Sequence, residues 1–205
     1  MKIKLVNARL SFADLFTPKS INGGASKFSG TFIASDETKI KFTKEDGTEV
    51  IVPHGRLKDV ADKVLTEKFG KIPSKVENWL YNQADGSTTR AAFTNGDDEY
   101  WSGFTADTWY VSAGKKESDC KNGVLDVVDQ RCEPVDSSSG LVHSGVYVDA
   151  VIDVYAYDGG SGKGLTGQLL GVQLRASGEA LGAAPVNVKS EFEQIEVAVS
   201  EDPNF

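Results

Sequence analysis

The longest regular alternation of apolar and polar positions lies between residues 146 and 175. From residue 146 to residue 156 every second side chain is apolar, and tyrosines and aspartates occupy most of the positions between them. A period of two predicts a strand with one buried face and one partly wetted face. The run DGGSGKG then turns the chain into a second strand, in which Leu170, Val172 and Leu174 share one face. We expect a hairpin at the centre of an antiparallel sheet.

The alternation also predicts a register for this hairpin. Pairing Ala156 with Thr166 brings apolar side chains opposite one another, with Ile152 facing Leu170. The outer face would then carry the tyrosines, several amides and Arg175.

The rest of the chain predicts short strands and one helical insertion. Alternation favours strands at residues 2–12, 28–35, 108–113 and 124–128, and a hairpin across residues 39–52. In the first of these, Val6, Ala8, Leu10 and Phe12 would share one face, and Ile3, Leu5 and Arg9 the other. A helical stripe runs from Leu57 to a stop at Gly70, and Pro73 can open a second short helix. Residues 13–27 and 82–100 have the composition of loops.

Five or more antiparallel strands with one helical insertion favour a small closed or half-closed barrel, mainly β, of which the OB-fold is the leading member. We expect residues 1–185 to form this single domain. Residues 186–205 are predicted to be a flexible acidic tail, disordered from about residue 191.

The net charge of −8 is unevenly distributed. Residues 1–75 carry 14 Lys and Arg against 9 Asp and Glu, a net charge of +5, so the remainder carries −13. The last fifteen residues hold five acidic side chains and no basic one. A basic front and an acidic tail indicate a polyanionic partner and a tail that can mimic it; a solvated tail that aids solubility is the alternative.

Composition also excludes several classes of protein. No run of about 18 apolar residues is present, so no membrane span is expected. The start, MKIKLVNARLSF, lacks the apolar stretch of a signal peptide. Two cysteines, Cys120 and Cys132, fit a reduced cytoplasmic protein.

Catalytic and metal-binding patterns are weak throughout. The run GGSGKGLT departs from a phosphate-binding loop, which would need glycine at Tyr157 and Ser or Thr at Gly164. Cys120, Cys132 and His143 match no familiar zinc spacing, and the acidic residues 97–99 fit a solvated turn better than a cation site. We therefore expect a protein that is not an enzyme and that needs no cofactor and no metal.

Aromatic and basic side chains supply the remaining signal. Single-stranded nucleic acid is held by rings that stack on bases and by Lys and Arg that contact phosphates. The candidates for such an interface are Phe16, Lys19, Lys27, Arg90, Tyr100, Trp101, Tyr147, Tyr155, Tyr157, Lys163 and Arg175. Trp79 and Trp109 fit the core better, and the tyrosines at 155 and 157 fit packing and binding equally. Asp149 and Asp153 share the tyrosine face and would repel phosphate, which directs the path toward either end of that strand.

Three stretches resemble the single-stranded DNA-binding proteins of tailed phages, a family once known only as a phage domain of unknown function. They are RLSFADLFTPK, KFSGTFIAS and SGVYVDAVIDVYAYDGGSGKGLTGQLLGVQLRASGEALG. The matched positions are Gly145, Tyr147, Tyr155, Ala156, Tyr157, Lys163, Gly164, Leu169 or Leu170, Val172, Gln173, Gly178, Glu179, Leu181 and Gly182. The resemblance implies an OB-fold that coats single-stranded DNA during phage replication or recombination, in the cytoplasm of an infected bacterium.

The resemblance extends to the tail. Glu201, Asp202 and Phe205 form a shorter acidic and aromatic ending than is usual in the family, and they imply recruitment of phage or host replication proteins. Two other functions stay open: a non-catalytic β module that binds protein or carbohydrate, and a virion structural protein. The choice between DNA and RNA and the formation of a homodimer also stay open.

Overall fold

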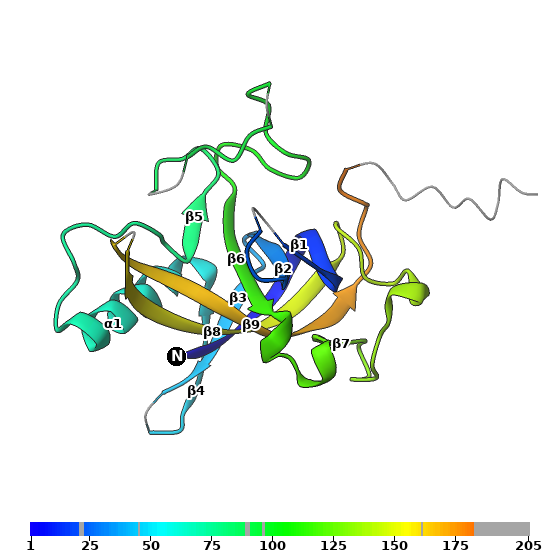
Figure 1. The fold of residues 1–205 in the computed structure, drawn as a ribbon, viewed down its shortest axis with the longest axis horizontal. Helices are drawn as coiled ribbons and strands as arrows, with labels where there is room; N and C mark the ends of the chain where they lie inside the picture. Colours follow the sequence, from blue (N-terminus) through cyan, green and yellow to red (C-terminus); the bar gives the residue numbers. More distant parts are fainter. Residues whose placement is uncertain (21–22, 45, 89–90, 96, 161, 183–205) are drawn as a thin grey trace, which may run out of the picture.

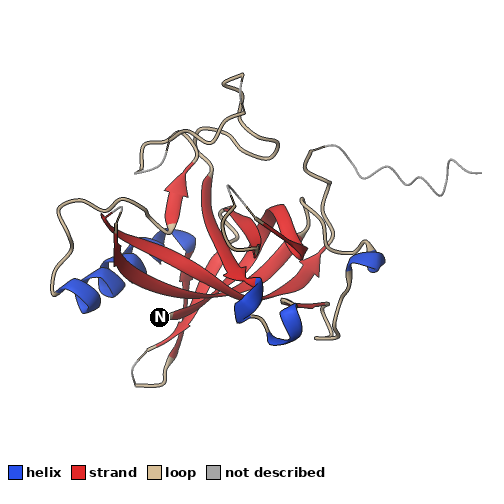
Figure 2. Cartoon of the chain, viewed as in Figure 1, coloured by secondary structure: helices blue, strands red, loops and turns tan. Residues whose placement is uncertain are grey.

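The computed structural model describes residues 1–182 except 21–22, 45, 89–90, 96 and 161 (Figure 1). Strands dominate the described chain (Figure 2). They are β1 (Lys2–Lys19), β2 (Lys27–Ala34), β3 (Lys39–Thr43), β4 (Glu49–Pro53), β5 (Tyr81–Gln83), β6 (Trp109–Lys116), β7 (Asp126–Val128), β8 (Tyr147–Gly159) and β9 (Gly162–Ala176). The helical elements are α1 (Leu57–Phe69) and the short 3-10 segments η1 (His54–Arg56), η2 (Glu117–Asp119), η3 (Lys121–Gly123) and η4 (Ser137–Ser139). No helix among the described residues is long and apolar enough to cross a membrane.

Five of the strands close into a ring in the order β1, β2, β6, β9, β8 and back to β1. Four of these contacts are antiparallel, and the contact between β6 and β9 is parallel. The β3–β4 hairpin extends the sheet from β1, while β5 and β7 pair with β6 and β9. The predicted mainly-β, OB-like architecture is confirmed, although the ring is not antiparallel throughout.

The first strand differs from its predicted pattern because of a bulge. Ile3 and Leu5 are buried, and then Ala8 and Leu10 are buried, so the core face switches along the strand. Asn7, between them, has a φ of 60°, and the register with β8 shifts at the same place. The inserted residue moves the later side chains to the opposite face. The prediction that Ile3 and Leu5 lie on the face opposite Ala8 and Leu10 was therefore wrong. Strand β1 also continues through half of the predicted loop.

The central hairpin is present, but its predicted register was wrong by one residue near the turn. Thr166 pairs with Tyr155 rather than with Ala156, and Ile152 pairs with Leu169. A bulge beside Ile152 accounts for the difference, because it adds one residue to β9. Leu169 is therefore fully buried in place of Leu170, which was predicted on the core face and is half-buried. Both residues are apolar, so alternation alone does not reveal this bulge.

The helix forms as predicted. Its buried residues are Leu57, Val60, Ala61, Val64 and Leu65, and it ends at Gly70, which has a φ of 75°. It packs against β8 near the turn of the β8–β9 hairpin (Figure 1). The second helix predicted at Pro73 is wrong: this part of the chain is extended, and Asn78 forms a parallel bridge with Gly164.

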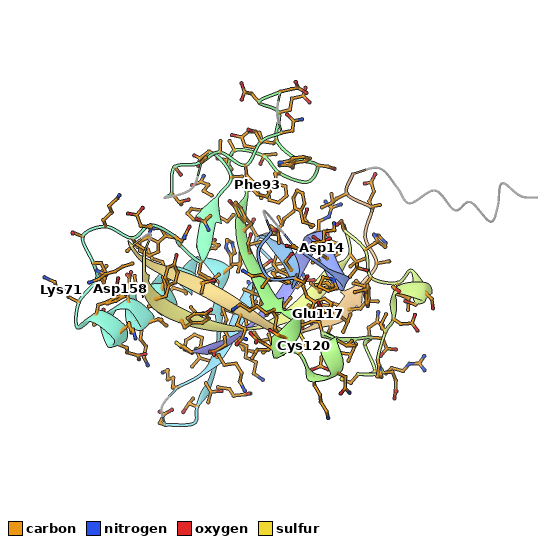
Figure 3. All side chains as sticks on the ribbon, in the orientation of Figure 1. Asp14, Lys71, Phe93, Glu117, Cys120 and Asp158 are labelled. Atoms are coloured by element: carbon orange, nitrogen blue, oxygen red, sulfur yellow. The ribbon has the colours of Figure 1, made fainter. Side chains whose placement is uncertain are left out.

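The core fills the ring and continues under α1. A second, smaller cluster of Ile33, Ala84, Phe104 and Tyr110 lies on the other side of β5 and β6. Phe93 packs against this cluster at the base of the loop that rises beyond β5 and β6 (Figure 3). The predicted loop, residues 82–100, covers most of this segment, and β5 was missed because it is only three residues long.

Candidate nucleic-acid interface

A groove of about 410 Å³ crosses β2, β6 and β9 on the side of the sheet opposite the core. Phe28 and Phe32 of β2 point into the core, so Thr31 points outward. Its hydroxyl lies 3.2 Å from the hydroxyl of Ser112 on β6, and the two form part of the groove floor. Gln168 and Thr166 of β9 line the far side. We refer to this feature below as the groove.

Four lysines gather at one end of the groove and are referred to as the lysine cluster: Lys19, Lys27, Lys115 and Lys116. Lys27 pairs with Lys19 across β1 and with Lys116 across β6. The amine of Lys19 lies 2.6 Å from Asp14, whereas the other three form no ion pair with any residue that the structure describes. These three lysines outnumber Asp119, the one acidic residue among the described residues that line the groove, and the excess of positive charge favours an anionic ligand.

Three exposed rings lie along the same groove. Phe12 and Tyr155 line it, and they are 39% and 46% exposed. Trp101, 43% exposed, meets Phe12 edge to face with ring centroids 5.5 Å apart. Rings that remain open to solvent in this way can stack on bases. The adjacent Tyr100 is exposed in the same loop.

The sequence pattern placed Phe12 on the same face as Ala8 and Leu10; this was wrong, because those two side chains are buried and Phe12 is exposed. Its φ of 48° lies in the left-handed region, which is rare for a bulky residue, and the register between β1 and β2 shifts beside it. Such backbone strain concentrates at functional sites. This backbone conformation turns the Phe12 ring out of the core and into the groove. Lys115 and Lys116 were also missed; their charge was visible, but nothing local placed them beside Lys27.

Tyr147 and Arg175 lie away from the groove. Arg175 forms two hydrogen bonds, of 3.1 and 3.2 Å, to the carboxylate of Asp149, and Lys4 lies 3.0 Å from the same group. Asp149 is buried and paired with these two cations, so its predicted place on the partly wetted tyrosine face was wrong. Tyr147 lines a separate cavity beside Asp36 and Glu37, an acidic setting that disfavours phosphate.

Three further candidates are partly used in packing. The amine of Lys163 lies 4.6 Å from the centre of the Phe69 ring, on the α1 side of the hairpin. Tyr157 accepts a hydrogen bond of 2.6 Å from the Asn78 amide and is half-buried, at the margin of a cleft next to the groove. Phe16 packs against the core. Arg90, Glu201, Asp202 and Phe205 lie outside the described residues.

The residues considered for metal binding do not converge in the structure. Cys120 is buried and Cys132 is exposed, and both are free thiols. Burial raises the pKa of the Cys120 thiol, which donates a 3.4 Å hydrogen bond to the Lys116 carbonyl. Within the described part of the chain, no group of three or more His, Cys, Asp or Glu could hold a metal ion.

A five-stranded ring whose ligand groove crosses its second and third strands is the arrangement in which OB-folds bind oligonucleotides and oligosaccharides. Here those strands are β2 and β6, and both line the groove. The chain is therefore an OB-fold protein with a basic, ring-lined groove at the usual ligand-binding face of that fold.

Comparison with known proteins gives the particular family. The model of a family described as Enterobacter phage Enc34, ssDNA-binding protein, matches residues 1–203, and the chain belongs to this family. A protein named p50 from Acyrthosiphon pisum secondary endosymbiont phage 1 is 32% identical over 203 residues, which cover 98% of both chains. The resemblance noted in the sequence is confirmed.

Solved structures share the fold. The single-stranded DNA-binding protein from bacteriophage Enc34 aligns with a TM-score of 0.58 and 18% identity, over 94% of this chain and 90% of that one. Its complex with ssDNA aligns with a TM-score of 0.59 and 21% identity, over 88% and 89%. The gp2.5 protein of bacteriophage T7, a single-stranded DNA-binding protein, aligns with a TM-score of 0.50 and 12% identity, over 98% and 99%.

Proposed function

We propose that this protein binds single-stranded DNA in the groove and coats it during phage replication or recombination. One observation carries the proposal: the lysine cluster and the exposed rings of Phe12, Trp101 and Tyr155 lie along one groove. Family membership supports the same ligand. The protein would act by binding, without catalysis, in the cytoplasm of the infected cell.

The groove supplies the two contacts that sequence-independent binding requires. Lys27, Lys115 and Lys116 attract phosphates at one end, and each neutralised phosphate releases counterions and makes the affinity depend on salt. The rings stack on bases of any sequence, with about 1–3 kcal/mol for each stacked base. Gln168, which lines the far side of the groove, can bond to sugar or base edges through its amide.

The lysine cluster also separates this function from the two alternatives. A neutral carbohydrate or a virion protein partner would not require an excess of lysines over acidic residues beside the rings. Binding to such a ligand would depend weakly on salt, whereas binding to a polyanion weakens steeply as salt rises.

Residues 186–205 would have two roles, one toward protein partners and one toward the groove. We infer that Glu201, Asp202 and Phe205 recruit replication proteins, with the ring entering an apolar pocket of the partner and the carboxylates meeting basic residues there. The same acidic segment would compete with DNA for the lysine cluster.

The test is a salt series with poly-dT, read by quenching of tryptophan fluorescence. Replacing Lys27, Lys115 and Lys116 by Ala should lower the affinity and reduce the slope of log K against log salt by about 2, since each phosphate contact on a single strand contributes about 0.7. The matched control replaces Lys39, Lys41 and Lys44 of β3 and its turn by Ala, with the same loss of charge. Equal slopes for the two triple variants would move the DNA path away from the groove.

A further inference from the structure

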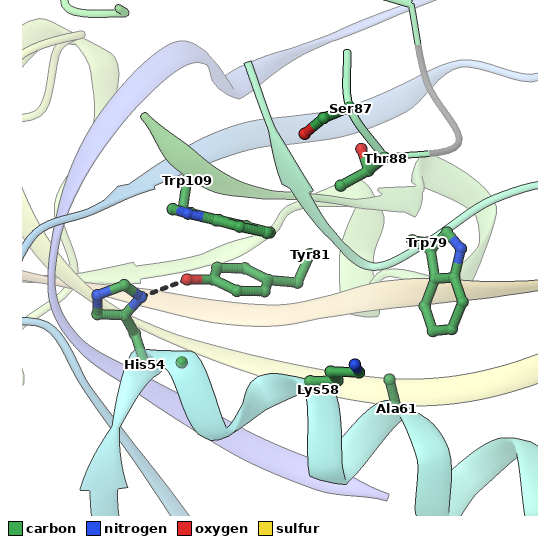
Figure 4. A pocket seen from close by; sticks show the side chains of 9 residues that line it. His54, Lys58, Ala61, Trp79, Tyr81, Ser87, Thr88 and Trp109 are labelled. Carbon is green, nitrogen blue, oxygen red and sulfur yellow. Dashed lines mark hydrogen bonds between the residues drawn. The ribbon is translucent and has the colours of Figure 1, made fainter. Parts of the chain in front are cut away.

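A second cavity lies beside α1 and is referred to as the side pocket (Figure 4). Its volume is about 690 Å³, within the range of small-molecule sites. It is lined by His54, Gly55, Lys58, Ala61, Trp79, Tyr81, Ser87, Thr88 and Trp109. In Figure 4 Trp79 faces the space from one side, Tyr81 and Trp109 from the other, and Lys58 and Ala61 of α1 form the floor.

The ring pair of Tyr81 and Trp109 gives the pocket a rigid aromatic wall. The two rings are stacked, with centroids 4.4 Å apart and an interplanar angle of 21°. The Tyr81 hydroxyl is hydrogen-bonded to Nδ1 of His54, which fixes the ring (Figure 4). Burial raises the pKa of Tyr81 and lowers the pKa of His54, so both side chains are uncharged near neutral pH. A neutral, fixed ring wall suits a stacked heterocycle.

The polar groups around the pocket suit a nucleotide. The hydroxyls of Ser87 and Thr88 donate hydrogen bonds of 3.2 Å to the amide oxygens of Gln83 and Asn82. Their oxygen lone pairs therefore remain as acceptors for the N–H groups of a base. Lys58 is exposed and forms no ion pair with any described residue, so its ammonium can contact a phosphate or a base carbonyl.

The side pocket and the groove border the same cleft. Trp79 lines both the side pocket and a cleft of about 290 Å³. Ser112 and Thr166 line both that cleft and the groove. A strand that leaves the groove past Tyr157 would therefore cross this cleft and meet the Trp79 ring, which borders the side pocket.

We propose that the side pocket holds a base of the same single strand that lies in the groove, inserted between Trp79 and the Tyr81–Trp109 wall, with Lys58 on its phosphate. This rests on the proposed function, because it extends the same DNA path. An apolar side chain of a protein partner fits less well, since it would leave the two hydroxyl acceptors and Lys58 without partners.

The first test blocks the pocket and varies the length of oligo-dT one nucleotide at a time. Gly55 lines the pocket, and a Cβ built there meets nothing within 4 Å, so Gly55→Trp should fold and occupy the space. The wild type should gain affinity in a step when the strand becomes long enough to reach the pocket. The variant should lose this step, about 5- to 150-fold, and keep the affinity for shorter strands.

The matched lysine variants sharpen the result. Lys58→Ala should reduce the same step, whereas Lys68→Ala, at an exposed site of the same helix outside the pocket, should leave it unchanged. A Gly55→Trp variant that binds every length like the wild type would overturn the proposal and leave the pocket to a protein partner.

A second readout follows the base directly. The chain has three tryptophans, so Trp79→Phe with Trp101→Phe leaves Trp109 as the sole emitter. Its fluorescence should be quenched by strands longer than the step and not by shorter ones; quenching that does not depend on length would overturn the proposal. A wild-type chain that binds no oligonucleotide would instead overturn the proposed function itself.

Discussion

Phe12 shows how a single residue can link the fold to the ligand. Its left-handed backbone costs on the order of 1–3 kcal/mol, which the surrounding sheet must offset. In return the ring meets Trp101 and Phe93 edge to face, with centroids 5.5 and 5.6 Å away, and also borders the groove. A buried ring at this position would leave Tyr155 without an aromatic neighbour along the groove.

At this scale we expect Tyr155→Ala to weaken single-stranded DNA binding by about 5- to 150-fold, the contribution of one stacked base. The ring is 46% exposed, so its loss should change the midpoint of thermal unfolding little. Tyr147→Ala is the control, because Tyr147 lines a different cavity. Titration with poly-dT at constant salt measures both variants, and equal losses would contradict the assignment of Tyr155 to the groove.

A substitution on the core face of β8 should lower the stability of the fold. Ile152 is fully buried, and Ile152→Ala should lower the free energy of unfolding by about 2–5 kcal/mol through lost burial and a cavity. Urea denaturation measures the loss. Val151→Ala, at a half-buried neighbouring site, should cost less, and a smaller effect at 152 than at 151 would argue against the observed faces.

Among the elements, the β8–β9 hairpin is closed at its base by two glycines. A Cβ on Gly145, just before β8, would come within 2.0 Å of the Glu179 carbonyl oxygen, and one on Gly178 within 2.1 Å of the Gly145 carbonyl oxygen. Gly145 also has a φ of 115°. The segments entering and leaving the hairpin can lie this close only without side chains.

Gly145→Ala should therefore destabilise the fold by more than about 1 kcal/mol, because the methyl group meets backbone and the φ is unfavourable. Gly160→Ala is the control: it has open space around the Cβ position and lies in the hairpin turn. Thermal unfolding of the two variants measures the difference. A Gly145→Ala chain as stable as the control would show that the base of the hairpin can open without loss.

At the scale of the whole molecule, charge is divided between the groove and the C-terminal residues. Residues 191–205 carry five acidic side chains, and the lysine cluster lies on the domain to which they are tethered. A tethered acidic segment competes at a high effective concentration with any anion that binds the same lysines. The acidic segment should therefore compete with DNA for the lysine cluster. Salt should weaken this competition, since it screens the attraction of the lysines both to the segment and to DNA.

Deleting residues 191–205 should tighten binding to single-stranded DNA, most at low salt, and leave the unfolding midpoint of the domain unchanged. Replacing the five acidic residues by Ser or Asn in the full-length chain is the matched control for length, and it should tighten binding to the same extent. Poly-dT titrations at about 50 and 200 mM salt measure the effect. Unchanged affinity at the lower salt would eliminate self-competition.

Local patterns in the sequence determined the main elements. Alternation predicted the β8–β9 hairpin, because each strand buries every second residue, and the stripe ending at Gly70 predicted α1. Repeated short strands indicated the OB-like class, and the motifs indicated the family. These features depend on residues that are close together in the sequence, so the local pattern of apolar and polar positions is enough to predict them.

Only the tertiary structure decided the site. The bulge at Asn7 and the strained backbone at Phe12 break the period that would have placed their neighbours, because an inserted residue exchanges the two faces of a strand. Lys27 and Lys116 meet through the pairing of β2 with β6, and Tyr81 meets Trp109 through β5. Arg175, a plausible phosphate ligand by charge, is instead held by buried Asp149. Such contacts form between strands that are far apart in the sequence, so the local spacing of residues cannot predict them.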